Sequence, residues 1–160
     1  MSITVFERAR ILDPSRGIDE VGSVMIDGKK IVAAGKATLN QGVPDGATAI
    51  DCAGKAIMPG LIDGRVFIGE PGGEHRETIA SASVAAAAGG VTSIVMMPDT
   101  DPVIDNVALV EFVLRTAKDT AVVNIFPAAA ITKGLHGREM TEFGLLREAG
   151  AVAFTDGRNT

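Results

Sequence analysis

The stretch GGVTSIVMMP, residues 89–98, combines a glycine pair, an apolar run and a proline. The near-continuous apolar run, residues 91–97, includes β-branched residues and predicts a strand that is buried on both faces of a sheet. The Ala-rich segment before it, residues 78–88, predicts a helix that stops at Gly89 and Gly90. A helix that leads directly into a buried strand is typical of a parallel α/β sheet.

The same alternation of strand and helix extends on both sides of this stretch. Asn106 is placed to cap a helix, because its side-chain oxygen can accept a bond from the free N–H groups of the first turn. Gly150 marks the end of a shorter helix. The expected elements are a strand at 61–66, a helix at 106–118, a strand at 121–126, a helix at 141–149 and a strand at 151–154.

Repeated βαβ units require a parallel sheet, and two α/β architectures fit: an open doubly wound sheet and a (β/α)₈ barrel of the TIM type. No G-x-G-x-x-G motif opens the first helix, so the glycines do not favour the dinucleotide-binding form of the open sheet. A barrel needs about eight strands and roughly 250 residues. If the barrel is correct, residues 59–160 supply about four strands, or half of it, and the last strand has an apolar edge.

Residues 1–58 have the pattern of short strands joined by tight turns. The Asp27-Gly28 pair between two apolar runs, 23–26 and 30–33, predicts a hairpin whose turn residues take positive φ. Further strands are expected at 3–12, 47–52 and 56–58, the last two joined by Ala53-Gly54-Lys55 as a second pair. Together these segments predict a small antiparallel β subdomain.

The composition argues against several classes of function. Twenty acidic and fifteen basic residues give a net charge of -5, and aromatic residues make up 4%, which argues against a nucleic-acid partner. There is no run of about 18 apolar residues, and the first ten residues lack the apolar core of a signal peptide. We therefore expect a cytoplasmic protein that does not bind membranes. Cys52, the only cysteine, excludes an internal disulfide and a cysteine-based zinc site.

Four motifs, taken in order, resemble one enzyme family. Residues 59–72, PGLIDGRVFIGEPG, resemble the metal-site segment P-G-[LF]-I-D-x-H-x-H of the amidohydrolase superfamily, and their E-P-G is similar to the pattern D-x-H-V-H-x-R-E-P-G of the dihydroorotases. Residues 86–92, 97–102 and 150–156 are similar to the family segments A-A-A-G-G-x-T, M-P-N-T-x-P and G-A-x-A-F-[ST]-D. The resemblance implies that residues 59–160 are the first half of a metal-dependent-hydrolase barrel. It also implies that residues 1–58 are the N-terminal part of a small β-sandwich-like subdomain.

The resemblance also shows where this sequence departs from the family. The two metal-binding histidines fall on Arg65 and Phe67, and only the bridging metal carboxylate, at Asp156, is retained. The substrate-binding arginine falls on Gly69 and the substrate-binding asparagine on Asp99. Zinc in such enzymes polarises the substrate and lowers the pKa of bound water to about 7. A guanidinium has no lone pair and a phenyl ring no ligand atom, so we expect no metal, and the catalytic residues are unknown.

Arg65, in the first metal position, is expected either to pair with Asp156 through a charge-assisted bond or to turn to solvent or to Glu70. Phe67 is expected to fill the vacated space as part of the core. A weaker alternative is a carboxylate cluster for a hard cation such as Mg²⁺, built from Asp63, Glu70, Asp99 and Asp156.

The two histidines of the chain do not replace the missing ligands. His75 lies among charged residues ahead of the helix at 78–88, and His136 lies in a glycine-rich loop. Both are expected to be solvated surface side chains.

For the function, the resemblance leaves three hypotheses open. The first is a non-catalytic dihydroorotase-like protein of de novo pyrimidine biosynthesis that acts as a structural partner of aspartate transcarbamoylase and forms a homo-oligomer. The second is an active zinc-dependent dihydroorotase, or another cyclic amidohydrolase, with a rebuilt metal site. The third is a truncated product without independent function.

Overall fold

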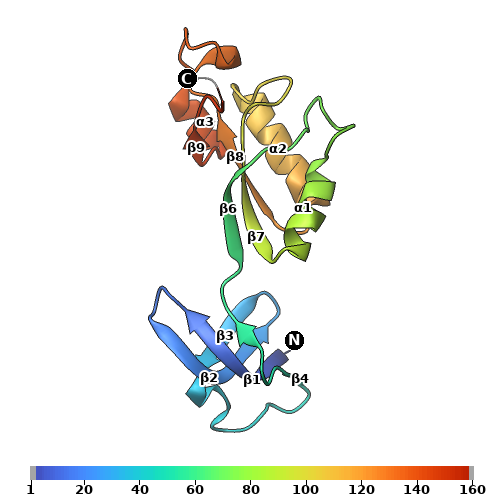
Figure 1. Cartoon of the computed structure of the whole chain (residues 1–160), viewed down its shortest axis with the longest axis vertical. Helices are drawn as coiled ribbons and strands as arrows, with labels where there is room; N and C mark the ends of the chain where they lie inside the picture. Colours follow the sequence, from blue (N-terminus) through green and yellow to red (C-terminus); the bar gives the residue numbers. More distant parts are fainter. Residues whose placement is uncertain (1–2, 159–160) are drawn as a thin grey trace. The chain divides into compact units, whose positions relative to one another are not determined.

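The computed structural model describes residues 3–158 of the 160-residue chain. The described chain divides after Pro59 into two compact units, each with its own sheet. Strands β1 to β5 form the first unit, and strands β6 to β9 with three α-helices form the second (Figure 1). Among residues 3–158, no helix is both long enough and apolar enough to cross a bilayer.

The first unit is a five-stranded sheet. Strands β1 (Ile3–Asp13), β2 (Ile18–Asp27) and β3 (Lys30–Gly35) are antiparallel neighbours, which confirms the predicted hairpin. Asp27 pairs with Lys30, so the turn consists of Gly28 and Lys29 rather than of Asp27 and Gly28. The expectation that both turn residues take a positive φ is wrong, because only Gly28 does, with a φ of 59°. A short 3₁₀ helix, η1 (Lys36–Leu39), follows β3.

The expected second antiparallel pair in this unit is wrong. Strands β4 (Thr48–Asp51) and β5 (Ala56–Ile57) do not pair with each other; both run parallel to β1. The turn between them is closed by the N–H of Lys55 bonding to the carbonyl of Cys52 at 2.9 Å, and both flanks of that turn bond to β1. The chain therefore continues along β1 after the turn instead of reversing, and the sheet is mixed.

The second unit is a four-stranded parallel sheet with helices between its strands. Its strands are β6 (Leu61–Val66), β7 (Val91–Met96), β8 (Asn124–Ala129) and β9 (Ala153–Phe154), paired in sequential order. Sequential parallel order is the order of a barrel, whereas an open doubly wound sheet reverses its strand order. The unit is a curled half-barrel, which is one of the two architectures that the strand and helix pattern left open and the one that the family resemblance implied.

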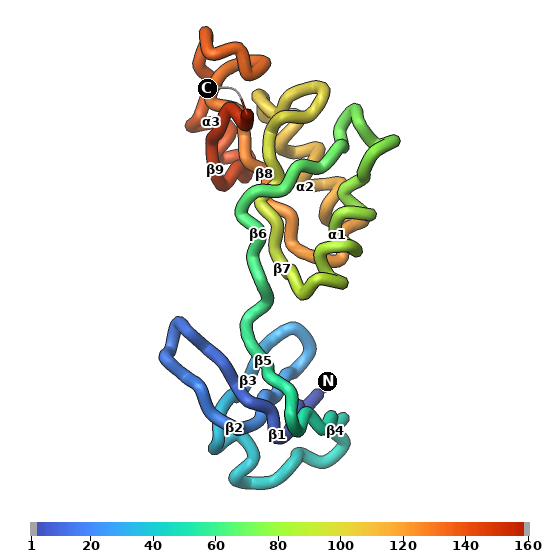
Figure 2. Tube along the Cα trace, viewed as in Figure 1, coloured from blue at the N-terminus to red at the C-terminus, as the bar shows by residue number. Residues whose placement is uncertain are grey.

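Three α-helices and one 3₁₀ helix connect these strands: α1 (Ile79–Ala88), α2 (Val107–Thr120), α3 (Phe143–Ala149) and η2 (Lys133–Leu135). The predicted cap of α2 is confirmed, because Oδ1 of Asn106 accepts a hydrogen bond from the N–H of Leu109 at 3.2 Å. The predicted stop of α3 is confirmed as well, with Gly150 in the left-handed region at φ 115°. Figure 2 follows this path from β6 to β9.

Two details of the predicted strands differ from the structure. Strand β8 begins at Asn124 rather than at residue 121, because α2 continues to Thr120 and the N–H of Val122 bonds to the hydroxyl of Ser83 at 3.1 Å. Strand β7 is not buried on both faces along its length, since Thr92 is exposed. Toward the carboxyl end, Ile94 and Met96 are buried and Val95 between them is half-buried.

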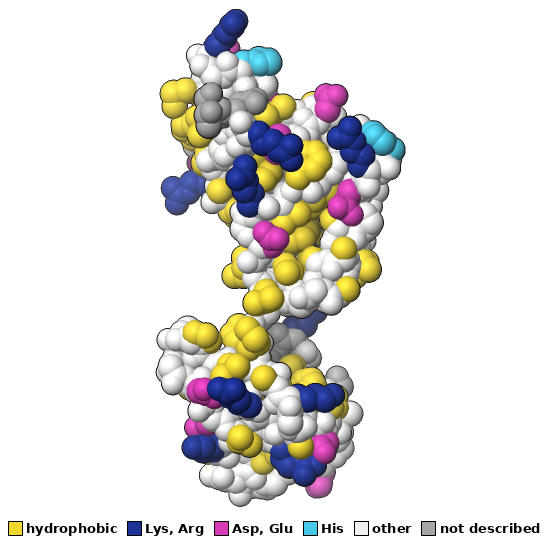
Figure 3. Space-filling view, viewed as in Figure 1, with side chains coloured by type: hydrophobic (Ala, Val, Ile, Leu, Met, Phe, Trp, Pro, Cys, Tyr) yellow, Lys and Arg dark blue, Asp and Glu magenta, His cyan; other side chains and the backbone are white. Residues whose placement is uncertain are grey.

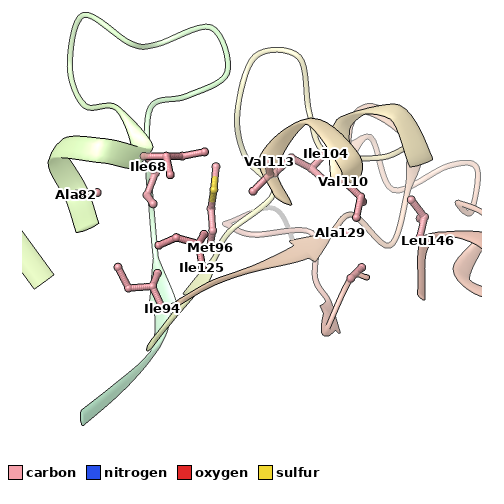
Figure 4. Close-up of a cluster of buried hydrophobic side chains, with 12 residues drawn as sticks. Ile68, Ala82, Ile94, Met96, Ile104, Val110, Val113, Ile125, Ala129 and Leu146 are labelled. Carbon is pink, nitrogen blue, oxygen red and sulfur yellow. The ribbon is translucent and has the colours of Figure 1, made fainter. Parts of the chain in front are cut away.

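The core of the half-barrel lies between the sheet and its helices. Ile94 and Met96 of β7 and Ile125 of β8 are at most 5% exposed and lie near Val110 and Val113 of α2, which are fully buried (Figure 4). This packing holds the carboxyl ends of the strands in fixed positions, and the loops that follow them carry the positions identified from the sequence.

Candidate functional site

The positions identified from the sequence lie near the carboxyl ends of the four parallel strands. Arg65 is the last residue but one of β6, Asp99 follows β7 by three residues, Thr132 follows β8 by three, and Asp156 follows β9 by two. The carboxyl ends of parallel barrel strands form one face, and active sites of such barrels lie on it. The fold therefore brings these residues to the expected face.

Two adjoining pockets open on this face. The first, which we call the loop pocket, has a volume of about 290 Å³ and is lined by Phe67, Gly69, Gly72, Gly73, His75, Arg76, Asp99, Thr100 and Asp101. The second, which we call the arginine pocket, has a volume of about 250 Å³ and is lined by Arg65, Phe67, Met97, Asp99, Gly157 and Arg158. Phe67 and Asp99 line both pockets.

Arg65 does not form the expected ion pair with Asp156. Its Nη2 donates a long hydrogen bond, 3.5 Å, to the carbonyl oxygen of Gly157, and its backbone N–H bonds to Oδ1 of Asp63 at 3.1 Å. No ion pair of Arg65 is present among residues 3–158. The pairing hypothesis is therefore wrong, because the carboxylate of Asp156 already has other partners.

Thr132 supplies those partners. Its backbone N–H donates to Oδ1 of Asp156 at 2.8 Å, and its hydroxyl donates to Oδ2 at 2.7 Å. Partial burial by itself would raise the pKa of Asp156, but these two bonds favour the ionised carboxylate and lower the pKa below its ordinary value overall. Both carboxylate oxygens of the one retained metal position are thus engaged within the protein.

Phe67 is not part of the core in the described chain. Its side chain is 40% exposed and forms a wall of both pockets. The expectation that it fills the vacated space is wrong for this chain.

The backbone at Gly69, the position of the family's substrate-binding arginine, leaves no room for a side chain. A Cβ atom added there would lie 2.3 Å from the carbonyl oxygen of Gly73 and 2.9 Å from that of Glu77. The N–H of Gly73 bonds to the carbonyl of Gly69 at 2.6 Å, which fixes this close approach. Only glycine therefore fits at position 69 in this loop conformation.

Asp99, the position of the family's substrate-binding asparagine, faces the two pockets with a carboxylate. Its Oδ1 is buried and has no hydrogen-bond partner among the described residues. A Cβ atom added at Gly157 would lie 3.3 Å from Cγ of Asp99, so the loop after β9 lies directly against this carboxylate. If the resemblance assigns this position correctly, a carboxylate stands here in place of a neutral amide.

The alternative carboxylate cluster for a hard cation does not form. Oε2 of Glu70 accepts a bond from the N–H of Ile79 at 2.8 Å, Asp63 is bonded to its own turn, and Asp156 is held by Thr132. Within residues 3–158, no group of three or more His, Cys, Asp or Glu side chains is arranged to hold a metal ion.

The histidines do not supply the missing ligands. His75 and His136 are both exposed, and His75 lines the loop pocket. Of the residues at the positions that the resemblance assigns to metal ligands, a guanidinium and a phenyl ring have no lone pair to offer, and a single carboxylate, already held by Thr132, does not make a zinc site.

Thr132, Gly157 and Arg158 are among the residues of this face that were not found from the sequence. Threonine and glycine are too common in loops for Thr132 or Gly157 to indicate a functional site. Each, however, follows an expected strand at a spacing that places it on this face. Arg158 follows the retained Asp156 by two residues, and this proximity was the available signal.

Comparison with known proteins agrees with the geometry. The family described as Dihydro-orotase-like matches residues 54–160. The dihydroorotase of Citrifermentans bemidjiense is 44% identical over 147 residues, which cover 92% of this chain and 34% of that protein. The dihydroorotase of Wolbachia sp. subsp. Brugia malayi is 46% identical over 149 residues, which cover 92% of this chain and 33% of that protein. The chain thus spans about a third of the length of these relatives.

Solved structures have the same fold. The L-hydantoinase (dihydropyrimidinase) from Arthrobacter aurescens superimposes with a TM-score of 0.78 at 25% identity, covering 96% of this chain and 32% of that one. The dihydropyrimidinase from Brevibacillus agri NCHU1002 gives a TM-score of 0.64 at 24% identity, covering 81% of this chain and 27% of that one, and shows the fold alone. From the family match and the fold together, the chain belongs to the dihydro-orotase-like family.

Proposed function

We propose that this chain belongs to a non-catalytic dihydroorotase-like protein of de novo pyrimidine biosynthesis. In this proposal the protein acts in the cytoplasm as a structural partner of aspartate transcarbamoylase and forms a homo-oligomer. The partner is taken from the resemblance to the family, and the loss of catalysis is argued from the side chains at the site.

The observation that supports the loss of catalysis is the donor set on the barrel face. Hydrolysis of a cyclic amide needs a polarised carbonyl and an activated water, and zinc provides both in metal-dependent hydrolases. Arg65 and Phe67 have no lone pair to offer, and Thr132 bonds to both oxygens of Asp156.

The substrate positions support the same proposal. Family members bind their substrate with an arginine and an asparagine, whereas this chain has Gly69 and Asp99 there. Gly69 leaves no room for a side chain, and the carboxylate of Asp99 repels an anionic substrate. Metal and substrate positions have thus changed together, which is expected when catalysis is no longer required.

The test is to produce the full protein together with the aspartate transcarbamoylase of the same organism, with an affinity tag on only one of them. We expect the two to co-elute in size-exclusion chromatography and the complex to give no hydrolysis of dihydroorotate. A dihydroorotase with an intact H-x-H pair, assayed in parallel, provides the positive control.

Two results would contradict the proposal. Turnover of dihydroorotate that is abolished by a chelator and restored by zinc would show a rebuilt metal site. Separate elution of the two proteins at micromolar concentrations would remove the structural role, and light scattering on the same sample reports the oligomeric state.

A further inference from the structure

The arginine pocket carries two cations that the proposed function does not use. Arg65 and Arg158 both line it, and neither takes part in an ion pair among residues 3–158. In the first unit, by contrast, Arg8 and Arg10 are paired with Asp51 and Asp19. Guanidinium groups stay protonated at all ordinary pH values, so the pocket has two positive charges that are not engaged in ion pairs among the described residues.

The donors of Arg65 are largely free to bind a ligand. The only hydrogen bond of its guanidinium among the described residues is the 3.5 Å contact with the carbonyl of Gly157. A guanidinium has five N–H donors in a planar fork that matches the oxygens of carboxylate and phosphate groups. The contact with Gly157 orients the fork and leaves most donors available.

The walls of the pocket strengthen this positive field. Phe67 and Met97 contribute apolar surface, and Met97 is only 8% exposed. Clefts with charges of one sign and low-dielectric walls focus the electrostatic potential and attract counter-ions. In the space-filling view, basic side chains lie beside exposed apolar ones on the visible face of the second unit (Figure 3).

Asp99 limits the kind of anion that fits. Its carboxylate lines the same pocket, so two cations face one anion. The remaining single positive charge favours a small anion over an extended polyanion, and an anion placed next to Asp99 is repelled.

We propose that the arginine pocket binds a small anion, a carboxylate or a phosphate, with its oxygens on Arg65 and Arg158. This inference rests on the proposed function in one respect. The anion would occupy the place where family members hold their metal, so the pocket cannot bind the anion and a catalytic metal at the same time. The pocket is then a ligand site rather than the remnant of a catalytic one.

The experiment is a titration of the full chain with sodium acetate and, separately, with inorganic phosphate, at constant ionic strength. Two-dimensional ¹H–¹⁵N NMR follows the amide signals of Phe67 and Gly157. We expect saturable shifts with at least one probe, and the probe that binds more tightly identifies the ligand as a carboxylate or a phosphate. Because a hydrogen bond to a charged group is lost, Arg65→Gln weakens binding by about tenfold.

Three further variants separate the site from general charge effects. Arg147→Gln removes an exposed arginine on α3 and leaves binding unchanged. Asp99→Asn removes the repulsion and tightens binding by about threefold. Arg158→Gln repeats the Arg65 test if Arg65→Gln does not fold, and circular dichroism checks folding in each case.

Shifts that do not saturate with either probe, or equal weakening in Arg65→Gln and Arg147→Gln, would overturn this proposal. That result alone leaves the proposed function intact. Zinc-dependent turnover would contradict the proposed function whatever the anion titration gives, so the two failures are distinguishable.

Discussion

Thr132 binds both carboxylate oxygens of Asp156, one through its backbone N–H at 2.8 Å and the other through its hydroxyl at 2.7 Å. The contact joins the loop after β8 to the loop after β9. Asp156 is the one residue that the resemblance matches to a retained metal ligand, and in this structure its carboxylate joins two loops.

This contact predicts a pH-dependent contribution to stability. The pKa of Asp156 is lowered from the ordinary 3.8, so its contribution is present above that pH and is lost as the pH falls through the lower folded-state pKa. Thr132→Val removes the hydroxyl donor and should lower the free energy of unfolding by about 1–2 kcal/mol near neutral pH. The loss should shrink in acid, as the pH falls below 3.8 and through the lower folded-state pKa, because the carboxylate then becomes protonated.

Urea unfolding near neutral pH and in acid measures this difference. Thr120→Val, which removes a hydroxyl bonded to the carbonyl of Thr116 at the end of α2, is the matched control and should show no such pH dependence. An equal loss of stability for Thr132→Val at both pH values would contradict the charge-assisted role of the bond.

A substitution at Gly69 should lower stability for a steric reason that does not involve charge. Gly69→Ala places a Cβ atom 2.3 Å from the carbonyl oxygen of Gly73, and the loop must shift to accommodate it. We expect a loss of about 2–3 kcal/mol, measured as a lower midpoint in thermal unfolding. Gly64→Ala, where no atom lies within 4 Å of the added Cβ, should change stability by less than about 0.5 kcal/mol. Equal effects of the two substitutions would show that the close approach at Gly69 is relieved easily.

We expect Glu70, a residue of the E-P-G motif, to have a structural role. Its carboxylate accepts a hydrogen bond from the N–H of Ile79, the first residue of α1, where the helix dipole favours negative charge. Glu70→Ala should cost about 1–2 kcal/mol, and Glu70→Gln less, because the amide oxygen still accepts the bond. Chemical denaturation measures both.

Glu148→Ala, at an exposed position on α3, is the control for removing a carboxylate. If Glu148→Ala destabilises the chain as much as Glu70→Ala does, the hydrogen bond from Ile79 to Glu70 does not contribute measurably to stability.

The fold was largely predictable where the signal is local. The cap of α2 at Asn106, the stop of α3 at Gly150 and the hairpin at Gly28 depend on residues next to one another in sequence, and all three are confirmed. The parallel pairing of β4 and β5 with β1 depends on a distant strand, and a turn at 52–55 looks the same in sequence whether or not the chain reverses there.

The site was predictable in its position but not in its contacts. Strand order brings Arg65 and Asp156 to one face, and opposite charges at such positions suggest an ion pair. The pair fails because Thr132 competes for the carboxylate, and a threonine after a strand carries no sequence signal for that bond. The closed backbone at Gly69 likewise depends on the loop's own hydrogen bonds.

The most direct measurement is the zinc content of the chain. Purified chain is equilibrated with zinc, desalted and analysed by elemental mass spectrometry, with Asp156→Ala treated in the same way. Because Arg65 and Phe67 offer no lone pairs, we predict that the two samples carry the same background level of zinc. One tightly bound zinc per chain that is lost in Asp156→Ala would contradict the loss of the metal site.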